Sequence, residues 1–106
     1  MKRHKVLVVD DSAFMRKLIS AIVNSDPAFE VVATARNGRD ALEKLRHLEV
    51  DAMTLDVEMP EMNGLEALQH VMTEHPLPII MISSLTYQGA KETIYALEQG
   101  AFDFVA

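Results

Sequence analysis

The sequence predicts an α/β fold, a doubly wound parallel sheet of five strands whose elements follow one another in the order (βα)4β. Short, continuous apolar runs, typical of strands buried on both faces of a sheet, alternate with segments whose apolar residues recur at helical spacing. Glycine, proline and asparagine stand between these segments, where loops are expected. We therefore expect helices on both faces of a single sheet.

The first strand and helix are expected within residues 6–27. The β-branched run at 6–9 ends abruptly at two aspartates, as a buried strand does. Ser12 is the expected N-cap of the next helix, and residues 26–27 are its expected end. The inner stripe of this helix is expected to comprise Phe14, Met15, Leu18, Ile19, Ile22 and Val23, with Arg16 and Lys17 on the other, solvent side.

The middle of the chain repeats this alternation. A second strand is expected within residues 30–35, followed by a turn at Asn37 and a helix. A third strand, 52–55, stops at Asp56. A loop then leads to a third helix, and Gly64 at its start is expected to be needed for the backbone conformation there.

The strand expected at 79–82 is the most hydrophobic, and we therefore expect it at the centre of the sheet. A fourth helix with Ile94 and Leu97 facing inward is expected to end at Gly100. Residues 102–105 are expected to start a fifth strand.

Composition excludes several classes of function. The net charge of −6 opposes binding to a nucleic-acid backbone, and the basic cluster at residues 2–5 is too short to reverse it. The absence of cysteine excludes disulfides and thiolate metal sites. The apolar runs are far shorter than the roughly 20 residues that span a bilayer, and the N-terminus lacks the apolar stretch of a secretory signal. We expect one cytoplasmic domain, residues 1–106, without membrane insertion or nucleic-acid binding.

Acidic and hydroxyl side chains follow three of the predicted strands at the point where each strand ends. Asp10 and Asp11 follow the first strand, Asp56 the third and Ser83 the fourth. Function in doubly wound sheets collects at the carboxyl ends of the strands. Three close carboxylates favour a hard cation, and Mg²⁺ is the one that prefers oxygen ligands together with a phosphate. Such a site can accept a phosphoryl group by in-line attack of a carboxylate, with the serine hydroxyl holding one phosphoryl oxygen.

Each of these residues also has an ordinary interpretation. The aspartate pair 10–11 can cap the first helix, Asp56 can be a loop residue, and the serine pair 83–84 can belong to a turn. Their occurrence at successive strand ends, in the order that a phosphoryl site needs, favours the functional interpretation.

Segments 8–12, 55–60 and 82–84 resemble the receiver domains of two-component response regulators, which have the flavodoxin-like fold. The resemblance implies that a sensor histidine kinase phosphorylates this chain in the presence of Mg²⁺. It assigns phospho-acceptance to Asp56, direct Mg²⁺ binding to Asp11, water-mediated binding to Asp10, a metal-ligating backbone carbonyl to Glu58, phosphoryl contact to Ser83 and a rotamer switch to Phe104.

A finer resemblance, carried by segments 12–16, 83–86 and 100–105, is to the receivers of chemotaxis protein-glutamate methylesterases. In that family the unphosphorylated receiver blocks the active site of a following serine-hydrolase domain. The present sequence contains no G-x-S-x-G elbow, so we expect a regulatory domain that is not itself an enzyme. A stand-alone chemotaxis messenger and a regulator with another output domain are the alternatives. An aspartyl-phosphate phosphatase and a scaffold with an inactive pocket are further ones.

The family pattern continues beyond the last residue of this sequence, Ala106. Receivers carry a lysine-proline pair after the fifth strand, and then a fifth helix, neither of which is present here. We therefore expect a receiver truncated at its C-terminal end, with slowed phosphorylation. Apolar sheet surface beside the first helix is expected to be uncovered, which favours dimers, swapped strands or low stability.

Overall fold

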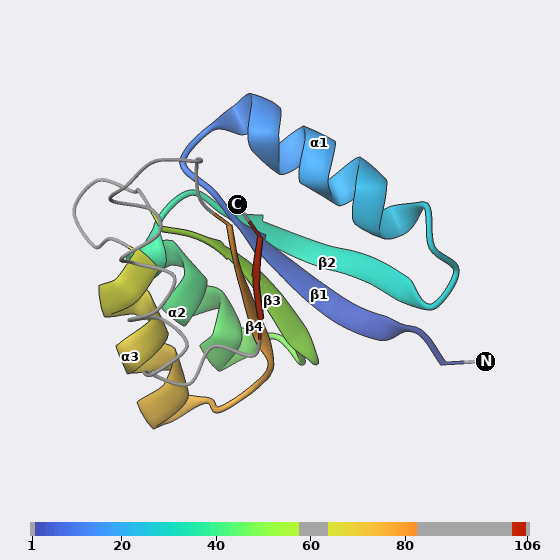
Figure 1. Cartoon of the computed structure of the whole chain (residues 1–106). Coiled ribbons are helices and arrows are strands. Elements are labelled where there is room, and N and C mark those ends of the chain that lie inside the picture. Colours follow the sequence, from blue (N-terminus) through green and yellow to red (C-terminus); the bar gives the residue numbers. More distant parts are fainter. Residues whose placement is uncertain (1, 58–63, 83–102, 106) are drawn as a thin grey trace.

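The computed structural model describes residues 2–57, 64–82 and 103–105. Its elements are β1 (His4–Val9), α1 (Ala13–Asn24), β2 (Phe29–Ala35), α2 (Gly38–His47), β3 (Ala52–Asp56), α3 (Gly64–Glu74), β4 (Ile79–Ile82) and β5 (Asp103–Val105). The strands are parallel and lie in the order β2-β1-β3-β4-β5, with α1 on one face of the sheet and α2 and α3 on the other (Figure 1). The predicted doubly wound fold is confirmed.

Two predictions about the second half of the chain have different outcomes. The strand at 79–82 is not central, because β3 occupies the middle of the sheet and β4 lies between β3 and β5. Continuous hydrophobicity indicates burial on both faces, which every inner strand has, and does not distinguish the middle strand from its neighbours. The predicted fourth helix, with Ile94, Leu97 and Gly100, lies outside the described residues.

The face covered by α2 and α3 holds the larger core. From β1 it takes Leu7 and Val9, which alternate with residues that point to the opposite face. Leu68 and Val71 of α3 are completely buried against it. Asn37 caps α2, its side-chain oxygen accepting from the Asp40 N–H at 2.8 Å, as the predicted turn allows.

The face covered by α1 holds a smaller core. Ile19 is buried there with Val6 and Val8, and Met15 and Val23 pack partly against them. Half of the predicted inner stripe is wrong, since Phe14, Leu18 and Ile22 are 74%, 43% and 61% exposed. Helical spacing defined a stripe wider than the part of α1 that meets the sheet. Phe14, Leu18 and Ile22 therefore form an outer half of α1 that none of the described residues covers.

Beside Ile22, at one end of this outer half, the sheet is hollowed. A pocket of about 250 Å³ is lined mainly by apolar side chains, Ile22 and Ile80 among them. Thr54 also lines it, and the buried Oγ1 of this residue has no hydrogen-bond partner among the described residues. Among the described residues, apolar surface beside α1 is thus accessible.

The edge strand β2 pairs irregularly with β1. Val6 pairs with Val31, whereas the next residue, Leu7, pairs with Ala33, so Val32 is an extra residue in the ladder. Such a β-bulge bends the strand and increases its twist.

Among the described residues, none of the helices is long and apolar enough to cross a membrane.

Candidate functional site

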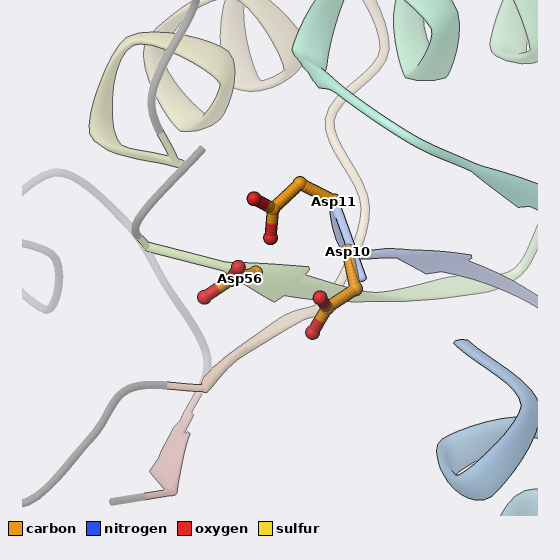
Figure 2. A group of neighbouring side chains, drawn as sticks. All are labelled: Asp10, Asp11 and Asp56. Carbon is orange, nitrogen blue, oxygen red and sulfur yellow. The ribbon is translucent and has the colours of Figure 1, made fainter. Parts of the chain in front are cut away.

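Three aspartates meet at the carboxyl ends of two neighbouring strands. Asp10 and Asp11 follow β1, Asp56 ends β3, and these two strands are paired. Each residue offers a carboxylate oxygen, and these oxygens all lie within 4.8 Å of one another. Figure 2 shows the carboxyl groups of Asp11 and Asp56 close together, with that of Asp10 beside them.

The register of the sheet brings these residues together. Val9 pairs with Leu55, so the residues that follow them, Asp10 and Asp56, lie at the same level at this end of the sheet. On the other side of β3, Asp56 pairs with Ile82 and the Val57 N–H donates to the Ile82 carbonyl at 3.0 Å. Asp56 is therefore held by the ladder with β4, one residue beyond the last pair with β1.

Asp10 is the buried member of the cluster, whereas Asp11 is exposed and Asp56 is half-buried. The Asp10 N–H donates to the Ala35 carbonyl at 3.0 Å, and its Oδ1 accepts from the Ser12 N–H at 2.9 Å. Ser12 is the predicted N-cap of α1, and its Oγ accepts from the Met15 N–H at 3.2 Å. The cap and the buried acid therefore belong to one short connection.

The electrostatics of the cluster favour a bound cation. Burial raises the pKa of Asp10 above its ordinary value, and the neighbouring Asp11 charge raises it further. The Ser12 N–H and the Arg16 guanidinium act in the opposite direction, but the net pKa shift is upward. Ionised Asp10 is thus disfavoured by its surroundings, and a cation beside it would relieve that cost.

The donor set fits Mg²⁺. All three side chains offer hard oxygen ligands, which Mg²⁺ prefers at about 2.1 Å in octahedral geometry, so that two ligand oxygens lie about 3 to 4.2 Å apart. A spread of up to 4.8 Å is slightly wider than this limit. The site therefore fits an ion that binds some of these carboxylates directly and reaches another through water.

Gly64 allows α3 to start close to Asp56. A Cβ at this position would lie 2.2 Å from the Asp56 carbonyl oxygen and 2.6 Å from the Val57 Cα. The Gly64 N–H donates to the Val57 carbonyl at 2.8 Å. Glycine is needed here because two backbones approach closely, and not for its own backbone conformation as predicted, since its φ lies outside the left-handed region.

The remaining predicted site residues are not tested by these contacts. Glu58 and Ser83 lie outside the described residues. The backbone of Phe104 belongs to β5 and pairs with Met81, while its side chain lies outside what is described. The roles of these three residues remain predictions.

One residue at the site was assigned wrongly from the sequence. Arg16 was expected on the solvent side of α1, yet its Nη1 donates to the Asp10 carbonyl at 2.9 Å. The available signal was its place, six residues after Asp10 and in the first turns of the helix that the acidic loop enters. Long side chains near a helix start can reach back to the preceding loop.

Comparisons with known proteins agree with this architecture. The family model of the response regulator receiver domain matches residues 6–106. A protein-glutamate methylesterase/protein-glutamine glutaminase of Geobacillus kaustophilus is 61% identical over 106 residues, which are 100% of this chain and 30% of the relative. The chain thus spans about a third of the length of this relative.

Two solved structures extend the comparison. The response regulator domain of Thermotoga maritima CheB superposes with a TM-score of 0.91 at 48% identity, covering 99% of this chain and 78% of that one. A chain of the CheX-CheY-BeF3-Mg²⁺ complex of Borrelia burgdorferi gives a TM-score of 0.83 at 34% identity, covering 97% of this chain and 77% of that one.

Proposed function

The chain belongs to the response regulator receiver family and is most like the regulatory domain of CheB, and from this premise we propose that it accepts a phosphoryl group on Asp56. The observation that supports the proposal is the approach of the three carboxylate oxygens at the ends of the paired strands β1 and β3. The phosphodonor is a sensor histidine kinase, the usual partner of this family.

The transfer is a displacement at phosphorus. A carboxylate oxygen of Asp56 attacks in line, the bond between phosphorus and the donor imidazole nitrogen breaks, and the imidazole leaves with the electron pair. Bound Mg²⁺ supplies positive charge to the phosphoryl oxygens and to the acidic cluster. Asp56 supplies the nucleophile from a backbone that is paired with β4 and directly follows the last residue paired with β1, which limits the motion needed before attack.

Asp10 and Asp11 are proposed to hold the cation, Asp11 directly and the buried Asp10 through water. The exposure of Asp11 leaves room for the ion and the incoming donor, whereas Asp10 is confined by its bond to Ser12. The proposed further roles are metal ligation by the Glu58 carbonyl, phosphoryl contact by Ser83 and switching by Phe104. A Mg²⁺-bound relative with BeF3 in its complex supports this chemistry in the family.

In the parent protein, the phosphorylated receiver is proposed to control a methylesterase output domain. The matched relative is named a protein-glutamate methylesterase, and the present chain corresponds to 30% of it. The receiver itself carries no such activity, and the parent is proposed to act in the cytoplasm. An aspartyl-phosphate phosphatase needs an acid two residues from a nucleophile after the first strand, whereas the aspartates after β1 are adjacent.

Intact-mass analysis after incubation with Mg²⁺ and acetyl phosphate tests the proposal. The unaltered chain is expected to gain the mass of one phosphoryl group, and Asp56→Asn is expected to gain none. Asp26→Asn is the matched control, because it makes the same change at the far end of α1 and keeps an oxygen that accepts from the Ala28 N–H. An adduct that persists in Asp56→Asn contradicts the assignment.

We also propose that a second copy of the 106-residue chain covers the outer half of α1. Phe14, Leu18 and Ile22 form an exposed apolar row at a spacing of four residues, and a mainly apolar pocket lies beside Ile22 at one end of this row. Light scattering between micromolar and millimolar concentration is expected to show a dimer that Leu18→Gln weakens. A monomer over the whole concentration range contradicts the proposed dimer but does not bear on the proposed phosphorylation of Asp56.

A further inference from the structure

Arg16 contacts the acidic loop twice, once with its backbone and once with its side chain. Its N–H donates to the Ser12 carbonyl at 2.9 Å, as one of the first hydrogen bonds of α1. Its guanidinium reaches back across the helix start, where Nη1 donates to the Asp10 carbonyl at 2.9 Å. A single residue therefore connects the first turn of the helix to the strand end that carries the acids.

The carbonyl that Arg16 holds belongs to the peptide between Asp10 and Asp11. A peptide unit is planar, so fixing the direction of the Asp10 carbonyl also fixes the N–H and Cα of Asp11. Asp11 follows that peptide directly and is exposed, with less surrounding structure to orient it than buried Asp10 has. Among the described residues, Arg16 donates the hydrogen bond that holds the carbonyl group of this peptide.

The other hydrogen bonds of Asp10 act on different groups. Its N–H is held by the Ala35 carbonyl, which continues the pairing of β1 with β2. Its Oδ1 is held by the Ser12 N–H. With the carbonyl bond added, the N–H, the carbonyl and one carboxylate oxygen of Asp10 are all engaged.

We propose that Arg16 is a positioning residue of the cation site, holding the Asp10–Asp11 peptide in the orientation that brings the Asp11 carboxylate within reach of Asp56. The inference rests on the proposed function, because it assumes that this cluster binds Mg²⁺. Arg16 itself contacts neither the ion nor the phosphoryl group.

Charge and positioning predict opposite results when Arg16 is removed. A guanidinium beside the acids repels a divalent cation, so loss of its charge alone tightens Mg²⁺ binding, and a partly exposed charge pair accounts for only a few-fold change. Loss of a hydrogen bond that orients metal ligands typically weakens metal binding by about 10- to 100-fold. Positioning is the larger effect, and Arg16→Met is expected to weaken Mg²⁺ binding by about tenfold.

The experiment compares Mg²⁺ affinity by calorimetry in the unaltered chain, Arg16→Met, Arg16→Lys and Lys17→Met. Lys17→Met is the matched control, because it removes one positive charge from the adjacent, exposed position, which has no described bond to the loop. It is expected to change Mg²⁺ affinity by less than about threefold. Arg16→Lys keeps a charged donor and is expected to recover part of the affinity that Arg16→Met loses.

A second readout needs no metal. Amide hydrogen exchange at Asp11 and Ser12, measured by NMR without Mg²⁺, is expected to accelerate in Arg16→Met and to stay unchanged in Lys17→Met. Unchanged exchange, or Mg²⁺ binding in Arg16→Met at least as tight as in the unaltered chain, overturns the inference. Should Arg16→Met fail to fold, a partial loss in Arg16→Lys without loss in Lys17→Met supports it, and equal behaviour of the two overturns it.

The two readouts separate this inference from the proposed function. Absence of Mg²⁺ binding in the unaltered chain contradicts the proposed function, while the exchange rates still decide whether Arg16 orders the loop. Normal Mg²⁺ binding with no effect of Arg16→Met contradicts only the role of Arg16.

Discussion

The two faces of the sheet differ in how completely the helices cover them. On the face under α2 and α3, the described residues include fourteen buried side chains in one core, whereas the face under α1 has three. Both faces draw on the same strands, since Leu7 and Val9 point to one and Val6 and Val8 to the other. The difference therefore lies in the covering helices: α2 and α3 close their face, and α1 covers only part of the other.

The difference also separates stability from chemistry. The α2 and α3 face supplies most of the buried apolar area and therefore most of the hydrophobic stabilisation. The helix of the thinner face follows the loop that carries Asp10 and Asp11. We expect changes on the first face to alter the free energy of unfolding, and changes on the second to alter cation binding and association.

The largest effect is expected when a buried side chain is shortened to alanine, and residues of similar size in the two cores allow a direct comparison. Leu68→Ala removes a fully buried side chain from the larger core and is expected to lower the free energy of unfolding by about 3 to 4 kcal/mol. Ile19→Ala, in the smaller core, is expected to cost about 2 kcal/mol, because fewer neighbours lose contacts. Urea denaturation measures both. Equal losses would mean that the two faces stabilise the fold alike.

Gly64→Ala is expected to have the next largest effect. Alanine is favoured over glycine in a helix by about 1 kcal/mol, but here its Cβ would collide with the backbone of β3. We expect a net loss of about 2 kcal/mol in the free energy of unfolding, together with weaker Mg²⁺ binding as Asp56 shifts. His70→Ala, on the exposed side of α3, is the control. A stabilised Gly64→Ala would show that the close approach is easily relaxed.

Asp10→Asn is expected to raise the free energy of unfolding, whereas the preceding substitutions lower it. Burial raises the pKa of Asp10, so the folded state binds its proton more tightly than the unfolded state does. This contribution is fully present below the unfolded pKa, near 3.8, and is lost as the pH rises through the folded value. Without metal at neutral pH, the Asn variant is expected to be more stable by about 1 kcal/mol.

The pH dependence and Mg²⁺ provide the checks on Asp10→Asn. Urea melts should show the advantage of the variant disappearing as the pH falls below about 3.8, because the proton then neutralises Asp10 in both states. Saturating Mg²⁺ is expected to stabilise the unaltered chain more than the variant. An advantage that persists at acidic pH would place its origin in packing.

The smallest change in stability is expected from Phe14→Ser on the exposed row of α1. This side chain is 74% exposed, so its loss should alter the free energy of unfolding by less than about 0.5 kcal/mol. The apparent mass in light scattering should nevertheless fall at high concentration. A loss of stability comparable with that of Ile19→Ala would mean that Phe14 is covered in solution.

Most of the fold could be predicted from the sequence, because the strand and helix periodicities of apolar residues are local patterns. Strand ends at Val9 and Asp56, and caps at Ser12 and Asn37, depend on near neighbours and were predictable. The approach of the three aspartates followed from a general property of parallel sheets. Their separation and their unequal burial required the register of β1 against β3.

What the sequence did not predict depends on three-dimensional contacts that the spacing of residue types does not specify. The exposure of Leu18 depends on what packs beside α1, and hydrophobic spacing alone does not specify this. The bond from Arg16 to Asp10 depends on one rotamer of a long side chain, for which a charged residue on a helix gives almost no signal. The close approach at Gly64 is likewise tertiary.

The bulge at Val32 has a consequence for how chains can aggregate. β2 is a border of the sheet, and its outward N–H and C=O groups would otherwise offer a template for another strand. The extra residue breaks the even spacing that an incoming strand must match. Growth into fibrils by strand addition at this border of the sheet is thereby discouraged.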